Sequence, residues 1–196
     1  IGKEVFGGTG MNVFNPALLA RAFAFFAYTP AMSGETVWYS GGTIHNWLGL
    51  TPTGTGEVMT TGATALAQLG DTGAMQYSTM DAFLGFMPGS IGETSTLAIL
   101  IGAAILLFTG VASWRIMLSV FLGGFAFAYL FEAMGPNALF QTDYPAYYHL
   151  LVGGFAFGAV FMATDPVTSA QTNTGKWIYG FMIGALAICV RVMNPA

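Results

Sequence analysis

Charge is scarce in this chain of 196 residues. Only 7% of the residues are Asp, Glu, Lys or Arg, whereas a soluble domain carries about a quarter charged residues. The mean hydropathy is +0.65, and 55% of the residues are hydrophobic. Five basic and nine acidic residues leave a net charge of -4, with no basic run to hold a phosphate backbone. The composition predicts a protein of the lipid bilayer and argues against nucleic acid as a partner.

Cysteine is almost absent as well. Cys189 lies in an apolar run and is the single cysteine, so neither a disulfide framework nor a cysteine metal site is expected within the chain. His45 has no Asp, Glu or Cys at metal-ligand spacing, which argues against a ligand or catalytic role. No metal site is predicted, and any redox chemistry requires an imported cofactor.

The start of the chain, Ile1-Gly2-Lys3, lacks the order of a signal peptide. The end, Asn194-Pro195-Ala196, has the order of a helix N-cap followed by Pro at the first helical position. We therefore interpret residues 1–196 as a single membrane domain from the interior of a larger chain. The alternative is a natural C-terminus.

The first apolar run, Ala17–Tyr28, follows a glycine-rich turn and Asn15-Pro16. About twelve residues at 1.5 Å each are too short for a hydrocarbon core of about 30 Å. Irregular backbone at membrane depth is tolerated only where protein buries it or a polar cavity hydrates it. Residues 1–28 therefore predict a turn and a half-helix beside a functional site.

Residues 29–79 are mostly polar and rich in Gly and Thr, and Trp38, Tyr39 and Trp47 are residues typical of a membrane interface. A connection of this length usually has a function. Its second half contains Thr64, which taken alone is typical of a helix N-cap.

Residues 80–196 predict one broken helix and about four transmembrane helices. Met80–Met87 is a short apolar piece that ends at Pro88-Gly89, after which Ser90 and Glu93 have the spacing of a capping box. The predicted spans are Thr94–Val111, Ile116–Phe131, Ala146–Thr164 and Trp177–Arg191.

Two short internal repeats suggest a transporter-like architecture. Gly123–Phe127 and Gly153–Phe157 share the sequence Gly-Gly-Phe-Ala-Phe, and small residues on successive spans allow helices to pack closely in lipid. Phe14–Ala17 is similarly echoed by Met193–Ala196, as expected if two structural repeats each contain a broken helix.

Phe157, Phe161 and Asp165 are spaced four apart, which places them along one face of a helix that Pro166 ends. An acidic group at such a depth is a candidate for a cation pathway below an aromatic constriction. Alternatively, Asp165 lies at the interface and caps the next turn, and spacing alone leaves both open. Glu132 and Asp81 are weaker candidates at other span ends.

Seven stretches, in order along essentially the whole chain, carry a resemblance to a known family: Gly2–Gly10, Asn15–Ala17, Arg21–Phe23, Thr61–Thr64, Met87–Glu93, Ala112–Ile116 and Met162–Pro166. They resemble a family of membrane subunits that includes NqrB of the bacterial sodium-translocating NADH:quinone oxidoreductase (Nqr) and RnfD of the related Rnf complex. Met87–Glu93 and Ser113–Ile116 favour the Nqr branch.

The resemblance implies that Thr64 carries FMN. In the family, a separate flavin transferase esterifies the FMN phosphate to the last Thr of a Ser/Thr-Gly-Ala-Thr motif, here Thr61, Gly62, Ala63 and Thr64. The small neighbours would give the transferase access to the hydroxyl. The family motif usually has an Asp six residues before this Thr, where the present sequence has Val58, with Glu57 one residue further away.

The resemblance also implies a noncovalent riboflavin, electron transfer towards ubiquinone, and partner subunits in a respiratory complex of the bacterial inner membrane. The family fold resembles that of urea and ammonium channels, with two inverted repeats of five helices and broken helices at the centre. Phe157, Phe161 and Asp165 would then correspond to a sodium constriction and the acidic residue beside it.

Composition and apolar runs predict an all-α polytopic membrane protein, and the resemblance implies a subunit of a redox-driven sodium pump with NADH:ubiquinone reductase (Na+-transporting) activity. One alternative is a membrane subunit of an Rnf-type ferredoxin:NAD oxidoreductase. A cofactor-free channel or transporter on the same fold would bind no flavin. An inert structural subunit would keep its turnover when Thr64 is replaced by alanine.

Overall fold

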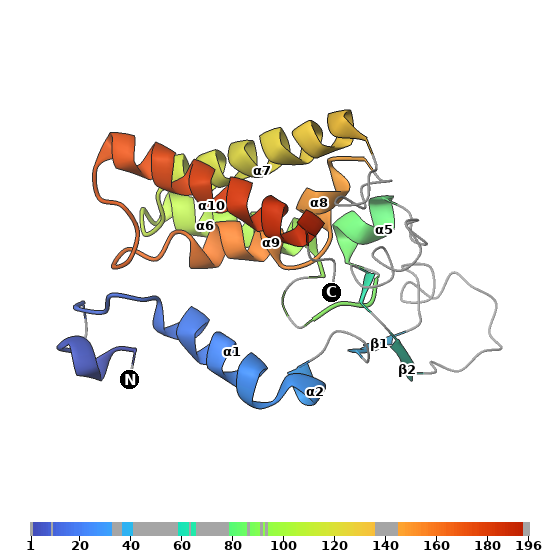
Figure 1. Cartoon of the computed structure of the whole chain (residues 1–196), viewed down its shortest axis with the longest axis horizontal. Coiled ribbons are helices and arrows are strands. Elements are labelled where there is room, and N and C mark those ends of the chain that lie inside the picture. Colours follow the sequence, from blue (N-terminus) through green and yellow to red (C-terminus); the bar gives the residue numbers. More distant parts are fainter. Residues whose placement is uncertain are drawn as a thin grey trace.

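The computed structural model describes residues 2–8, 10–32, 37–40, 59–62, 64–65, 79–85, 87–90, 92, 94–135 and 145–193. Within these ranges the chain is helical apart from one two-stranded sheet (Figure 1). The elements are the 3-10 turn η1 (Glu4–Phe6), α1 (Pro16–Ala27), α2 (Thr29–Met32), β1 (Val37–Ser40), β2 (Met59–Gly62), α5 (Thr79–Leu84), α6 (Thr96–Phe108), α7 (Trp114–Met134), α8 (Tyr148–Leu151), α9 (Phe155–Phe157), the π-helical segment η2 (Gly158–Met162) and α10 (Asn173–Met193).

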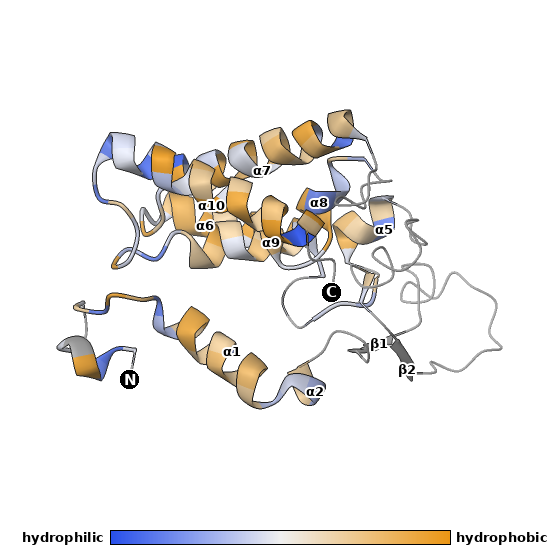
Figure 2. Cartoon of the chain, viewed as in Figure 1, coloured by the Kyte–Doolittle hydropathy of each residue, from blue (hydrophilic) through white to orange (hydrophobic). Residues whose placement is uncertain are grey.

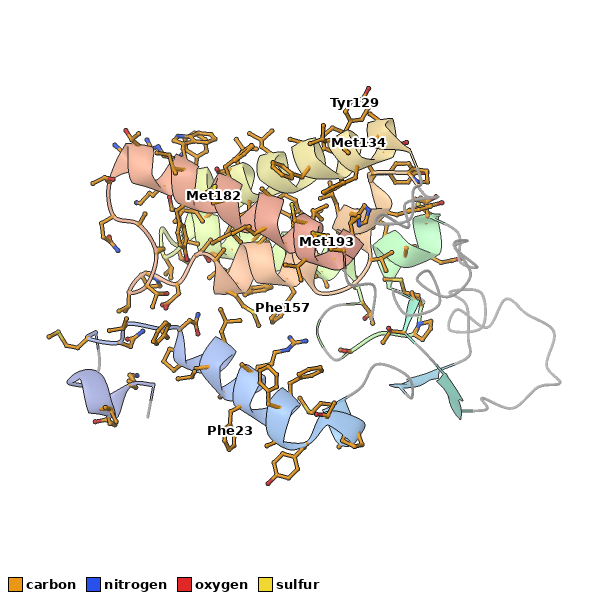
Figure 3. The ribbon with its side chains drawn as sticks, viewed as in Figure 1. Phe23, Tyr129, Met134, Phe157, Met182 and Met193 are labelled. Atoms are coloured by element: carbon orange, nitrogen blue, oxygen red, sulfur yellow. The ribbon has the colours of Figure 1, made fainter. Side chains whose placement is uncertain are left out.

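The helices α7 and α10 are the two described helices that are long and apolar enough to cross a membrane. Each has 21 residues, or about 31 Å at 1.5 Å per residue. They confirm that the apolar runs Ile116–Phe131 and Trp177–Arg191 form long helices. Their outer faces carry large exposed apolar side chains, including Tyr129 and Met182 (Figures 2 and 3). Such faces suit contact with lipid.

Glycines allow the backbones of α7 and α10 to approach each other closely. A Cβ atom on Gly180 would lie 2.8 Å from the carbonyl oxygen of Ile116, and one on Gly184 would collide with the carbonyl oxygen of Val120. The rings of Trp114 and Trp177 meet edge to face nearby, with centroids 5.9 Å apart. Since Ile116 faces Gly180 and Val120 faces Gly184, the two helices run parallel, with their N-termini at the same end of the bundle.

The predicted span Thr94–Val111 is shorter than expected. Helix α6 has 13 residues, about 20 Å at 1.5 Å per residue, which is less than a hydrocarbon core of about 30 Å. The capping box predicted at Ser90 is wrong, because the N-cap is Ser95, whose hydroxyl accepts from the amide of Ala98 at 3.2 Å. The last turn ends at Thr109-Gly110, where Gly110 has a left-handed φ of 72°.

The predicted continuous span Ala146–Thr164 is wrong. The chain forms α8, leaves helical geometry at Val152 and Gly153, and resumes as α9 and η2. Gly153 has φ 73°, a conformation that L side chains rarely adopt and that a continuous helix excludes. The short apolar piece predicted at Met80–Met87 is present as α5, and a further break lies in the interior of an apolar run that we expected to be regular.

The predicted half-helix is confirmed as α1. Asn15 is its N-cap and accepts from the amides of Ala17 at 2.9 Å and Leu18 at 3.4 Å, while Pro16 occupies the first helical position. None of its residues is buried, and it lies apart from the bundle of α6, α7 and α10 (Figure 1).

The polar segment 29–79 contains regular structure that the all-α prediction missed. Strands β1 and β2 pair antiparallel, with Trp38 opposite Thr61 and Val37 opposite Gly62. Thr and aromatic residues in short alternating runs suit strands. His45, Trp47, Glu57 and Val58 lie outside the described residues.

Candidate functional site

Thr64 lies at the end of the bundle where α8 and α5 are found. It is half-buried, and it lines a small cavity together with Pro88, Gly89, Thr94 and Gly153. The following residue, Ala65, is 5% exposed and donates from its amide to the carbonyl oxygen of Pro88 at 3.0 Å. This contact holds Thr64 beside the glycine break that precedes α9.

The cavity that the described residues form beside Thr64 is small. The cavity has a volume of about 10 Å³, about enough for one water molecule. Thr64 as a whole is half-buried, so part of this residue is exposed. Thr61 and Gly62 belong to β2, and Ala63 lies outside the described residues.

Arg191 connects α10 to the break between α8 and α9. Its Nη1 donates to the carbonyl oxygen of His149 at 2.6 Å and to that of Val152 at 3.1 Å. Carbonyls at the end of a helix lack partners within that helix, and a guanidinium can satisfy two of them at once. Arg191 thus stabilises the irregular backbone next to Thr64, a role that its position at the end of an apolar run did not reveal.

Phe157 and Phe161 form an aromatic pair on the segment that follows the break. Their ring centroids are 5.0 Å apart with an interplanar angle of 46°. A Cβ atom on Gly102 of α6 would lie 2.6 Å from Cζ of Phe161, so this ring packs directly on a glycine of the neighbouring helix. Because η2 is π-helical, the expected four-residue alignment with Asp165 is interrupted by a wider turn.

Asp165 follows this segment and caps the next turn. Its carboxylate accepts from the hydroxyl of Thr168 at 2.7 Å and from the amide of Val167 at 3.4 Å. Its carbonyl oxygen accepts from the amide of Ser169 at 3.0 Å. The capping role that the sequence left open is therefore present, and it fixes the carboxylate in place.

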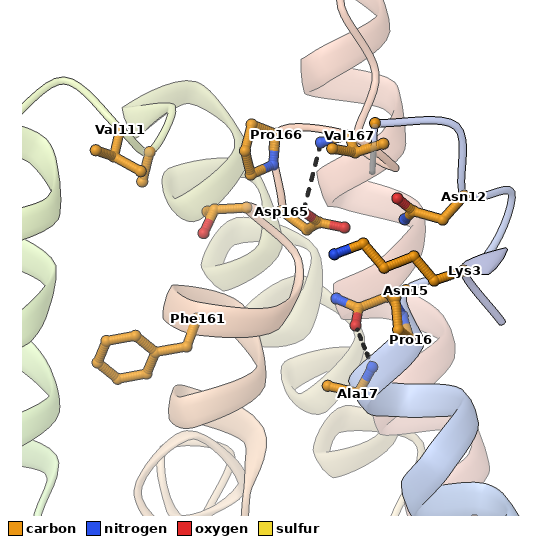
Figure 4. A pocket seen from close by; sticks show the side chains of 13 residues that line it. Lys3, Asn12, Asn15, Pro16, Ala17, Val111, Phe161, Asp165, Pro166 and Val167 are labelled. Carbon is orange, nitrogen blue, oxygen red and sulfur yellow. Dashed lines mark hydrogen bonds between the residues drawn. The ribbon is translucent and has the colours of Figure 1, made fainter. Parts of the chain in front are cut away.

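The same carboxylate also faces a cavity of about 400 Å³ (Figure 4). Its walls come from the N-terminal segment, from the connection between α6 and α7, and from the end of η2. The lining residues are Lys3, Gly10, Asn12, Asn15, Pro16, Ala17, Val111, Ala112, Phe161, Thr164, Asp165, Pro166 and Val167. The structure thus brings Phe161 and Asp165 together at a polar cavity. Phe157 does not line it.

Sequence reasoning missed Lys3, Asn12 and Asn15 as parts of this cavity. The glycine-rich turn and half-helix indicated a site near residues 1–28, but no local signal paired them with Asp165 more than 140 residues later. Among the described residues there is no cluster of three or more His, Cys, Asp or Glu that could hold a metal ion by itself. A cation at this cavity would be held by one carboxylate and neutral oxygens.

Two long apolar helices, an exposed short helix and an apolar run interrupted at Gly153 are typical of a polytopic α-helical membrane protein. The comparison with known families specifies this class. The model of the NQR2, RnfD, RnfE family matches residues 1–196, and the chain belongs to this family.

Three relatives are NqrB subunits of Na+-translocating NADH-quinone reductases. All of the present chain aligns with each of them. It is 53% identical over 200 residues to the protein of Chromohalobacter salexigens, 52% over 198 residues to that of Yersinia pestis and 50% over 199 residues to that of Pseudomonas aeruginosa strain LESB58. It covers 45%, 46% and 46% of these proteins. The chain therefore spans a little under half the length of these relatives.

Proposed function

We propose that this chain is part of a bacterial NqrB, a subunit of a Na+-translocating NADH-quinone reductase. In this proposal Thr64 carries FMN as a phosphoester, and Phe157, Phe161 and Asp165 line a Na+ pathway. The observation that carries the proposal is the position of Thr64. It lies half-buried beside Gly153, at one end of a broken helix whose other end leads to Asp165. The names of the relatives support a redox function over that of a channel without a cofactor.

The chain's own residues would place the flavin and shape the ion path. Ala65 and Pro88 hold the attachment residue against the bundle, and Arg191 fixes the break next to it. The attached flavin supplies the electron chemistry. The segment from Gly153 through α9 and η2 to Asp165 connects the two proposed sites.

The partners, the second flavin and the fold are proposed from the family to which the chain belongs. The proposed partners are the other subunits of a respiratory complex in the bacterial cytoplasmic membrane, a noncovalent riboflavin, ubiquinone and Na+. The proposed fold is the inverted-repeat fold of urea and ammonium channels, with α1 and the α8 to η2 segment as broken elements. The Rnf-type subunit is the second candidate, because the family model includes both branches.

Replacing Thr64 with alanine tests the flavin assignment. The full-length subunit, coexpressed with its flavin transferase, is denatured in SDS, and flavin fluorescence is measured in the gel. We expect the wild-type band to fluoresce and the Thr64→Ala band to be dark, because SDS releases a noncovalently bound flavin but not one that is covalently attached. Thr94→Ala is the matched control, since Thr94 lines the same cavity and is expected to keep the fluorescence.

A dark wild-type band would overturn the flavin assignment and favour a channel or transporter without a cofactor. Fluorescence in both the wild type and Thr64→Ala would place the attachment at another residue. If Thr64→Ala loses its fluorescence but reduces quinone at the wild-type rate, the flavin on Thr64 of the wild type is not needed for turnover.

The basic residues predict the orientation of the bundle in the membrane. Of the five basic residues, Lys3, Arg115 and Lys176 lie at the end where α7 and α10 begin. Arg21 lies within α1, and Arg191 is bound to backbone carbonyls at the other end of the bundle. By the positive-inside rule, the end that carries Asp165 faces the cytoplasm and the end that carries Thr64 faces the opposite side.

Cysteine labelling checks this orientation. In the full-length subunit without other reactive cysteines, we expect an impermeant maleimide to label Thr174→Cys in inverted vesicles and Met134→Cys in intact spheroplasts. Both residues are exposed and lie at opposite ends of the bundle. The reverse pattern would contradict the predicted orientation.

A further inference from the structure

The cavity at Asp165 has a second charged wall. Lys3 reaches it from the N-terminal segment, and Asp165 reaches it from the end of η2. These are the two charged residues among those that line it, and Figure 4 shows the Lys3 ammonium directed across the cavity towards the carboxylate. A positive and a negative charge therefore face the same cavity.

The carboxylate of Asp165 is fixed in orientation but has acceptor positions left for further hydrogen bonds. It accepts from Val167 and Thr168, and an ionised carboxylate has about four acceptor positions. The remaining positions can accept from an ammonium or bind a metal cation. Its orientation is set by its own turn, so it does not depend on which cation faces it.

The neutral side chains of the opposite wall have local partners. Asn12 donates to the carbonyl oxygen of Phe14 at 3.2 Å, and Asn15 accepts from the amides that begin α1. Lys3 is exposed, and its flexible stem carries a compact charge that can move within the cavity. Lys3 is therefore the group of this wall best able to approach or leave Asp165.

We propose that Lys3 is a tethered competitor for the cation site at Asp165. Its ammonium occupies the carboxylate side of the cavity when no metal cation is bound, and an entering monovalent cation displaces it. This inference rests on the proposed cation pathway and adds the residue that sets its affinity. No covalent step is involved, since one positive charge replaces another beside the same carboxylate.

The test is equilibrium binding of ²²Na+ to the purified full-length complex. The signal used is the difference in ²²Na+ binding between the wild type and Asp165→Asn, which isolates binding at Asp165. We expect Lys3→Gln to lower the dissociation constant of this part about three- to fivefold, the range of a solvent-accessible ion pair. Lys3→Arg should keep a value near that of the wild type, and Lys176→Gln, a lysine that does not line the cavity, should leave it unchanged.

The possible results distinguish a failure of the Lys3 proposal from a failure of the proposed cation pathway. If Asp165→Asn weakens ²²Na+ binding but Lys3→Gln has no effect, the lysine assignment is wrong and the pathway stands. If Asp165→Asn binds ²²Na+ as the wild type does, both proposals are wrong. A Lys3→Gln effect that persists in the Asp165→Asn background also overturns the inference, because Lys3 would then act elsewhere.

Discussion

Replacing Gly184 with alanine is expected to lower the free energy of unfolding by about 3 kcal/mol, because the added methyl group has no space. A Cβ atom at this position would collide with the carbonyl oxygen of Val120 and lie 2.6 Å from the backbone nitrogen of Gly124. Backbone atoms inside a helix cannot move aside, so α7 and α10 must separate. In lipid the hydrophobic effect does not drive helices together, and close packing is a main source of stability.

The measurement is an unfolding titration of the full-length subunit in mixed detergent micelles. Gly158→Ala is the matched control, because a Cβ atom there meets nothing within 4 Å and the residue already has helical φ and ψ angles. We expect this control to change stability by less than about 1 kcal/mol. Equal stabilities of the two variants would show that glycine contacts do not hold these helices together.

Replacing Arg191 with methionine is expected to have an effect of similar size, for a different reason. The variant keeps the length of the side chain but leaves the carbonyl oxygens of His149 and Val152 without this donor. Each buried group left without a partner costs about 1–3 kcal/mol. For the two carbonyl oxygens the total expected loss is about 2–6 kcal/mol, concentrated at the break before α9.

Thermal unfolding and limited proteolysis of the full-length subunit would check this expectation. Arg21→Met is the control, since Arg21 is exposed on α1, and we expect it to change stability by less than about 0.5 kcal/mol. Arg191→Lys should be intermediate, because an ammonium lacks the planar fork of donors. An Arg191→Met variant as stable as the control would mean that the break holds its shape without the arginine.

The sequence predicted the local elements well where their signals were local. Asn15 followed by Pro16 marked the start of α1, and the structure confirms the cap at hydrogen-bond distance. The scarcity of charge and the apolar runs located α7 and α10. The half-helix was recognised because its length alone rules out a full span. These features depend on neighbouring residues and on composition.

Predictions failed where a distant contact overrode a local pattern. The two Gly-Gly-Phe-Ala-Phe stretches were expected to pack helices together, and this is true of the first, since a Cβ atom on Gly124 would meet the ring of Phe155 from the second. In the second stretch, Gly153 instead breaks the helix. An identical pattern of residues thus has two roles, and the sequence offers no way to distinguish them.

For the candidate sites, too, the sequence identified residues with a local motif but not their distant neighbours. Thr64 and Asp165 were identified from short motifs and their resemblance to a family, and they remain the residues of the proposed function. The sequence did not place Thr64 beside Gly153, and it did not place Lys3 across a cavity from Asp165. It also offered no reason to expect that Arg191 binds the break.

The sequence by itself determined the class of environment, the order of the apolar runs and the first broken helix. Each of these follows from transfer of side chains into lipid and from hydrogen bonds within one or two turns. The tertiary structure decided which apolar run is interrupted, which glycines allow helices to touch, and which charges face one cavity. Those outcomes depend on the close approach of segments far apart in the chain, where steric fit and unpaired backbone groups outweigh local preference.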